Sequence, residues 1–81
     1  EDRAILVTLY HATGGKSWRN NRGWDTDANI GDWHGVAVDV DNGVVGLKLY
    51  LNNLSGGIPK ELGGLPALKM LALGGNQLSE T

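Results

Sequence analysis

The chain lacks cysteine and phenylalanine, has only two prolines, and contains no long apolar run. Without cysteine there can be no disulfide bond and no cysteine-ligated zinc, which favours a reducing, cytoplasmic compartment. The longest aliphatic stretch is "AILV" at residues 4–7, which is too short to cross a membrane as a helix. Seven basic and nine acidic residues give a net charge of −2, so neither a nucleic acid nor an anionic membrane is expected as a partner.

The length limits the chain to one small domain. A domain of 81 residues buries only about 60% of the surface of its unfolded chain, so its hydrophobic core is thin. Apolar side chains left uncovered at one end of such a domain will therefore influence its behaviour.

A repeat of 24 residues organises the second half of the sequence. The stretch "VVGLKLYLNNLSG" from Val44 matches the stretch "LKMLALGGNQLSE" from Leu68 at six positions. A period of about 20 to 29 residues with the pattern L-x-x-L-x-L-x-x-N-x-L is typical of leucine-rich repeats, in which each unit contributes one short strand. The matching pairs are Val44/Leu68, Leu47/Leu71, Leu49/Leu73, Asn52/Asn76, Leu54/Leu78 and Ser55/Ser79.

Each residue type in the repeat has a physical role. Leu47 and Leu49 alternate along a strand, so both side chains point to the same face. Asn52 and Asn76 stand where the chain leaves the strand, where a buried amide can bond backbone groups that the turn leaves unpaired. The following "GGIP" permits a tight turn, and Pro59 ends strand pairing. The pattern predicts strands that turn a corner, with the asparagines of stacked units aligned as a ladder.

The segment "NNLSGGIPKELGGLPALKMLAL" resembles the plant-type class of leucine-rich repeat, whose units carry an L-S-G-x-I-P-x-x-L-G-x-L run. Residues 2–49 resemble the N-terminal cap of such arrays, with a helix, a tryptophan-rich loop, a W-x-G-V segment and a hairpin. Secreted plant caps usually carry cysteines around W-x-G-V, and this chain has Gly31 and Val38 at the matching places. In this respect it resembles the cysteine-free caps of bacterial, algal and protist repeat proteins.

The resemblance implies an α/β solenoid of the leucine-rich repeat class. An N-terminal helical cap and a β-hairpin would lead into two repeats of 24 residues with a parallel β-sheet. The implied boundaries are residues 1–43 for the cap, 44–67 for the first repeat and 68–81 for an incomplete second repeat.

The residues of the expected cap agree with this organisation. Asp2 is a candidate helix N-cap, apolar residues recur at helical spacing as far as Tyr10, and Gly14 is a natural stop. These features predict a helix of about three turns whose apolar face covers the first end of the stack.

A β-hairpin and a set of large packing residues are expected in the rest of the cap. Two alternating runs flank "DNG", which is a strong hairpin signal. The predicted pairing places Val36, Val38 and Val40 beside Val45, Leu47 and Leu49. The residues interpreted as packing pieces in place of disulfides, each with an indole N–H that needs a partner, are Trp18, Trp24 and Trp33.

Motifs for catalysis or ligand chemistry are incomplete. The "GGKS" of residues 14–17 lacks the phosphate-loop glycine at Tyr10 and follows a predicted helix instead of a strand, so nucleotide binding is not expected. The "DTDANIGD" of residues 25–32 starts like a calcium loop, but Ile30 replaces the required glycine and Val36 the bidentate glutamate, which favours a solvated loop.

No enzyme site is expected either. His11 and His34 have no partner at metal-ligand spacing, and no motif places a serine beside a histidine and an orienting acid. The sequence therefore predicts no catalytic residues, no metal site and no cofactor.

Binding is the function that repeat geometry favours. Parallel strands stacked in a curved solenoid form a concave sheet, which such proteins commonly use to hold partners. The expected function is a non-catalytic protein–protein interaction module, the N-terminal part of a leucine-rich repeat recognition array. The candidate binding residues on the concave face are Asp39, Lys48, Tyr50, Leu51, Met70 and Ala72. The alternative is that Ala72, Gly74 and Gly75 simply make this face smooth.

The sequence "NQLSET" ends the second repeat before its own G-x-I-P, so the leucines of that repeat are expected to be uncovered on one side. Repeat arrays generally need at least about three units and a closing cap. Either the chain is the front of a longer array, or a second copy covers its open end through self-association. A third hypothesis is polysaccharide binding on the concave face, for which only Tyr50 offers an aromatic platform.

Overall fold

The computed structural model describes residues 2–79, which form one α-helix, five short strands and three 3₁₀ helices. Glu1, Glu80 and Thr81, at the ends of the expected cap and second repeat, lie outside the described residues. In chain order the elements are α1 (Asp2–Ala12), η1 (Gly15–Ser17), η2 (Ile30–Asp32), β1 (Val36–Val38), β2 (Val44–Lys48), β3 (Ser55–Gly57), η3 (Lys60–Gly64), β4 (Met70–Ala72) and β5 (Gln77–Ser79).

Helix α1 buries the face that its apolar spacing predicts. Leu6 and Leu9 are fully buried, and Tyr10 is nearly so. The chain leaves the helix at Gly14, whose φ of 70° is the left-handed conformation that glycine adopts without strain. Asp2 differs from the expected N-cap because it is itself helical, and its carboxylate accepts a hydrogen bond from the N–H of Val44 at 2.9 Å. The carboxylate thus joins the start of the helix to the start of β2.

The main sheet has the strand order β1–β2–β4 and is mixed, not parallel throughout as the fold class implied. β1 runs antiparallel to β2 through the predicted hairpin, whereas β2 and β4 are parallel, with Leu47 opposite Leu71. A second, two-stranded sheet pairs β3 with β5 in parallel, with Gly56 opposite Leu78. The repeat length of 24 residues therefore sets the register of the parallel strands: each residue of β2 lies opposite the residue 24 positions later in β4.

The predicted pairing of the hairpin is only partly present because β2 contains a bulge. Val36 lies opposite Leu47, but Val38 lies opposite Val44, with a register shift between them. A bulge inserts one extra residue into a strand, so Val44 is fully buried while Val45, which was expected to point inward with Leu47, is half-buried.

The pairing predicted for Val40 was wrong. Val40 lies outside β1, and its side chain is fully exposed. Asp39 closes the hairpin one residue earlier, because its N–H donates to the carbonyl oxygen of Gly43 at 2.9 Å. Its carboxylate also accepts hydrogen bonds from the N–H groups of Asp41 and Gly43, both at 2.9 Å. The local turn made by Asp39 therefore leaves Val40 at the hairpin tip.

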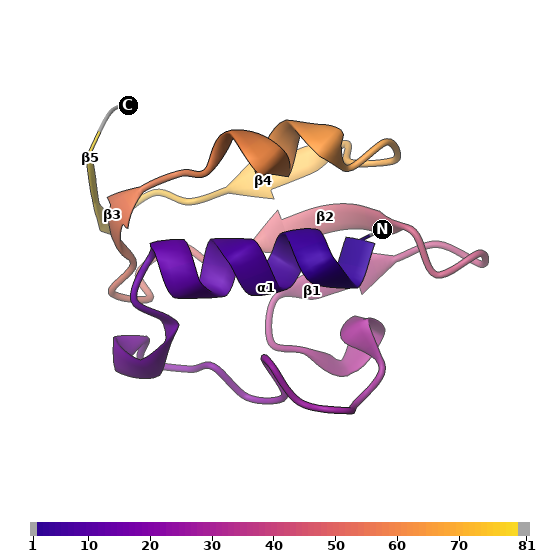
Figure 1. Ribbon diagram of the computed structural model, residues 1–81, viewed down its shortest axis with the longest axis horizontal. Coiled ribbons are helices and arrows are strands. Elements are labelled where there is room, and N and C mark those ends of the chain that lie inside the picture. The colour runs from indigo at the N-terminus through magenta and orange to yellow at the C-terminus, as the bar shows by residue number, and fades with distance from the viewer. Residues whose placement is uncertain (1, 80–81) are drawn as a thin grey trace.

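The helices cover one face of the main sheet. In Figure 1, α1 lies in front of β1 and β2, and the coiled segment Lys60–Gly64 lies in front of β4. α1 also packs against this second segment, η3, so the two helices form one layer. The core fills the space between this layer and the sheet, and no helix of residues 2–79 lies over the opposite face of the sheet (Figure 1).

The three tryptophans are core residues, as the sequence predicts. Their side chains are between 1% and 5% exposed. The ring of Trp24 lies between those of Trp18 and Trp33, with centroid distances of 4.8 and 5.1 Å. Each indole N–H donates to a backbone carbonyl oxygen, so none is left unpaired in the core. The acceptors for Trp18, Trp24 and Trp33 are Thr13, His34 and Ala28 in that order.

Gly31 and Val38, the positions that match cysteines of plant caps, touch each other. A Cβ atom built on Gly31 would lie 2.9 Å from a methyl carbon of Val38 and 4.0 Å from its Cβ. Because the valine methyl fills the space beside the glycine, close packing joins η2 to β1 at this point.

Candidate functional site

The asparagine amides of Asn52, which is buried, and Asn76, which is half-buried, hold the turns that follow β2 and β4. The Oδ1 atom of Asn76 accepts the N–H of Asn52 at 2.9 Å, and its Nδ2 donates to the carbonyl oxygens of Leu49 and Leu73. Asn52, which is 3% exposed, repeats the arrangement: its Oδ1 accepts the N–H of Asn20, and its Nδ2 donates to the Asn20 carbonyl oxygen. The predicted ladder is present, and it extends one step further, to the tryptophan-rich loop.

The outer face is the side of the β1–β2–β4 sheet away from α1, and it presents Ala37, Gly46, Lys48, Met70 and Ala72. In the parallel pair, Gly46 lies opposite Met70, and Lys48 lies opposite Ala72. The Met70 side chain lies over Gly46, since a Cβ atom there would be 3.3 Å from the methionine Cε. Three of the predicted binding residues, Lys48, Met70 and Ala72, therefore share this face.

A groove of about 450 Å³ opens where β2 ends. Lys48, Tyr50 and Leu51 line it, and the sequence predicts all three as binding residues. The opposite walls come from the loop segments before η2 and before β1. Arg19 stands on the first of these walls, and His34 and Gly35 stand on the second.

Tyr50 and Leu51 are the most exposed large side chains beside this groove. Tyr50 is 56% exposed and Leu51 is 65% exposed. Leu51 has a φ of 52°, an unusual conformation for a leucine, which turns the chain from the strand into the asparagine corner. Its side chain lies against Gly75, where a Cβ atom would collide with it. These contacts fix the direction of the chain at the end of the groove.

Asp39 is separated from the other predicted binding residues. It lies at the hairpin turn before β2, whereas Tyr50 and Leu51 follow the end of β2. Its carboxylate is already bonded to two N–H groups of its own turn. In the structure Asp39 therefore shapes the hairpin.

Arg19, His34 and Gly35 were missed by sequence reasoning. Arg19 is placed by backbone bonds across the fold, since its N–H donates to the carbonyl oxygen of Asn52 at 3.1 Å. Repeat spacing carries no signal for a contact between a loop and a repeat. For Gly35 a signal was available in the W-x-G-V segment, because its φ of 81° is a conformation that favours glycine.

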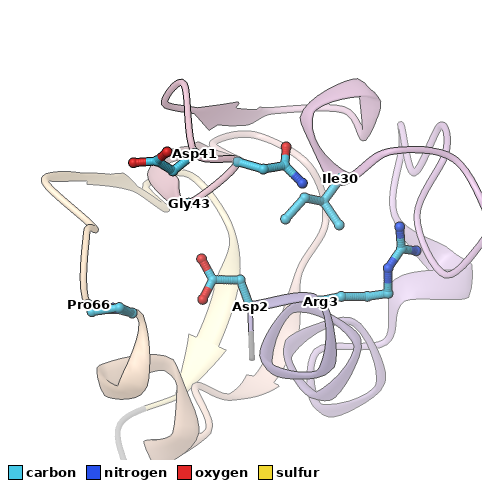
Figure 2. Close-up of a pocket in the computed structure, with 7 residues that line it drawn as sticks. Asp2, Arg3, Ile30, Asp41, Gly43 and Pro66 are labelled. Carbon is cyan, nitrogen blue, oxygen red and sulfur yellow. The ribbon is translucent and has the colours of Figure 1, made fainter.

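A second hollow, of about 400 Å³, lies at the start of α1. Figure 2 shows Asp2 and Arg3 from the helix, Asp41 and Gly43 from the hairpin turn, and Pro66 at its rim. The two charged groups of the helix are engaged within the fold: Asp2 accepts the Val44 N–H, and the guanidinium of Arg3 donates to two loop carbonyl oxygens. We interpret this hollow as a structural contact between the start of α1, the hairpin and the loop.

Two further features can be stated for residues 2–79. They contain no group of three or more histidine, aspartate or glutamate side chains placed to hold a metal ion. No helix among them has the length and apolar character needed to span a membrane.

The comparisons with known proteins give structural matches only. No family model matches the chain, and no curated protein matches its sequence. A leucine-rich repeat protein from Bacteroides eggerthii DSM 20697 superposes with a TM-score of 0.80 and 31% identity, over 90% of this chain and 12% of that protein. The PEPR1–AtPEP1 complex superposes with a TM-score of 0.74 and 24% identity, over 95% of this chain and 11% of the matched one.

The chain has a fold of the leucine-rich repeat type. The matches agree with the repeat read from the sequence and with the parallel pairing of β2 and β4. The chain spans about one tenth of the length of either matched protein.

Proposed function

We propose that this chain is a non-catalytic protein-interaction module that binds its partner on the outer face. The observation that carries the proposal is the exposure of two large side chains, Met70 on the outer face and Tyr50 just beyond the end of β2. Tyrosine and methionine offer large contact areas, and the short side chain of Ala72 lets a partner approach the backbone closely. The structural matches, which are leucine-rich repeat proteins, support a role in protein interaction.

We further propose that the chain is the front of a plant-type leucine-rich repeat array. Residues 1–43 would be the cap, 44–67 the first repeat and 68–81 an incomplete second repeat of a solenoid. The proposal is supported by the two edges of β2, because β1 and the tryptophan-rich loop cover one edge while β4 extends the sheet on the other. The side chain of Leu71, which would face the next repeat, is 46% exposed.

Self-association is a second candidate role, and Leu71 is again the observation that favours it. Leu68, Leu73 and Leu78, which belong to the same repeat, are only half-buried among residues 2–79. A second copy could cover these side chains and pair with the open edge of β4. Polysaccharide binding is less well supported, because Tyr50 is the only exposed aromatic side chain within the described part of the chain.

A selection from displayed peptides tests the principal proposal. Peptides that bind the immobilised 81-residue chain would be tested against Tyr50→Ala and Ala72→Arg. The second variant places a long charged side chain on the outer face. Binding should fall at least about tenfold in both, because hot-spot contacts at interfaces carry this much free energy. Glu61→Ala, on the helical layer, is the control and should bind normally. Peptides that bind all variants equally would contradict the outer face as the site.

A further inference from the structure

The groove at the end of β2 is basic. Arg19, Lys48 and His34 line it, and no acidic residue does. Within residues 2–79, neither Arg19 nor Lys48 forms an ion pair, and the described ion pair is between His11 and Asp25. The positive charges of Arg19 and Lys48 are therefore available to pair with an anionic group of a partner.

This local charge contrasts with the rest of the molecule, which limits the kind of partner. The whole chain has a net charge of −2, so an extended polyanion that crosses the surface would meet repulsive carboxylates outside the groove. A segment with one or two acidic side chains would gain the local attraction without that repulsion. Charge complementarity therefore favours a short acidic segment.

An unpaired backbone donor belongs to a residue that lines the same groove. The N–H groups of Leu49 and Leu51 donate to Ala72 and Gly74, both at 2.9 Å, on the side of β4. The N–H of Lys48 donates to Gly35, which lines the groove, and Tyr50, two residues further along the chain, lines it as well. No acceptor among residues 2–79 is bonded to the N–H of Tyr50. An extended peptide could supply the missing carbonyl oxygen.

The walls of the groove are held in place by hydrogen bonds. Asn52 fixes the first wall, because its side chain bonds both backbone groups of Asn20, next to Arg19. The second wall is fixed at Gly35, whose carbonyl oxygen accepts the N–H of Lys48 at 2.8 Å. A ligand would therefore bind to a site formed before its arrival, and little conformational entropy would be lost by the protein.

From this geometry we infer that the groove binds an extended acidic peptide segment of a protein partner. A carboxylate of the segment lies between Arg19 and Lys48, a carbonyl oxygen accepts the Tyr50 N–H, and an apolar side chain packs on the tyrosine ring and Leu51. This inference rests on the proposed function and adds the chemistry of the partner.

A titration with defined peptides tests the inference. The probe is a blocked peptide of five residues with two glutamates that flank a valine, and its twin has glutamines in their place. Added to the ¹⁵N-labelled chain, the glutamate peptide should shift the amide signals of Arg19, Gly35 and Tyr50. Its affinity should exceed that of the twin and should fall about three- to fivefold in Arg19→Gln and in Lys48→Gln, because each variant removes one exposed charge. Lys60→Gln, an exposed lysine in η3, is the matched control and should bind unchanged.

Four results would overturn the inference. The glutamine twin could bind equally well, the shifts could fall outside the groove, or the control could lose as much affinity as the groove variants. Tighter binding of a heparin oligosaccharide or an oligonucleotide would assign the groove to polyanions and would also overturn it. The inference can fail while the proposed function holds: displayed peptides that need Tyr50 and Ala72 but have no acidic residues would support the outer face and reject the acidic segment.

Discussion

At the scale of single residues, the asparagine amides connect the sequence pattern to the site. An asparagine amide accepts hydrogen bonds through its oxygen and donates them through its nitrogen. It can therefore bond both a backbone N–H and a backbone C=O where no neighbouring strand does so. Asn76 does this for the preceding repeat, through Asn52 and Leu49, and Asn52 does it for the loop that holds Arg19. An aspartate in the same place could only accept. The position of the groove wall therefore depends on the amide chemistry of Asn52.

Replacing Asn52 with alanine should destabilise the fold. Asn52→Ala removes two hydrogen bonds to the backbone of Asn20, so the free energy of unfolding should fall by about 2 kcal/mol. Urea unfolding followed by tryptophan fluorescence measures the change. Asn29→Ala is the matched control, since Asn29 is exposed and makes no side-chain capping bond, and it should change stability by less than about 0.5 kcal/mol. Equal stability of the two variants would show that the Asn52 amide contributes nothing.

The contact between Gly31 and Val38 allows a disulfide to be tested. The distance of 4.0 Å between an added Cβ at Gly31 and the Cβ of Val38 falls within the disulfide range of about 3.5–4.5 Å. The double variant Gly31→Cys and Val38→Cys should therefore oxidise readily, and its oxidised form should be about 2 kcal/mol more stable than its reduced form. Thermal unfolding with and without reductant gives the comparison.

The single variant Gly31→Cys is the control for this disulfide. With Val38 retained, the new side chain would press against a valine methyl only 2.9 Å from its Cβ, so this variant should be less stable than the unsubstituted chain. Failure of the double variant to oxidise in air, or an oxidised form less stable than the reduced one, would contradict the geometry.

At the scale of elements, the junction between β1 and β2 depends on Gly35. Gly35→Ala should lower the free energy of unfolding by about 2–3 kcal/mol, because its φ of 81° strains any other residue and its Cβ would collide with the carbonyl oxygen of Lys48. Gly63→Ala is the matched control, since no atom lies within 4 Å of the Cβ that it adds. Chemical denaturation of both variants tests the difference. A loss of the same size in both would mean that neither the collision nor the φ angle is specific to Gly35.

Elements that follow from periodicity were predictable, and those set by local side-chain bonds were not. The pairs Leu47/Leu71 and Asn52/Asn76 gave the strand register and the ladder, because residues at the same position of two stacked repeats lie next to each other. Val40 was misplaced, because the hairpin turn is closed by hydrogen bonds of Asp39 that alternation does not encode.

The candidate site divides in the same way. Lys48 was predictable because it belongs to a repeat strand and alternates with core leucines. Arg19 was not, because its loop is held by a backbone hydrogen bond from Arg19 to Asn52 and by the Asn52 side chain on Asn20, and no repeated spacing encodes these contacts. The structure was therefore needed to show that a basic wall stands beside the predicted face.

At the scale of the whole molecule, the hydrophobic core is buried more completely at the N-terminal end than at the second repeat. Leu6, Leu9 and the tryptophans close the core beneath α1 and the tryptophan-rich loop. In the second repeat, Leu71 is 46% exposed, although its counterpart Leu47 is fully buried. The two leucines occupy equivalent positions in β2 and β4. The difference in their exposure is therefore the apolar surface that another strand, stacked on β4, would cover.

Exposure of this kind should make the chain associate in solution. Sedimentation over a wide concentration range should show a mass that rises with concentration, because contact between two copies removes apolar surface from water. Leu71→Glu should weaken this association at least about tenfold, since it places a charge in the contact. Val40→Glu is the matched control: Val40 is fully exposed at the hairpin tip, so its substitution should leave the association unchanged. A monomer at every concentration, or equal weakening by both variants, would contradict self-association through the second repeat and leave the outer face as the remaining interaction surface.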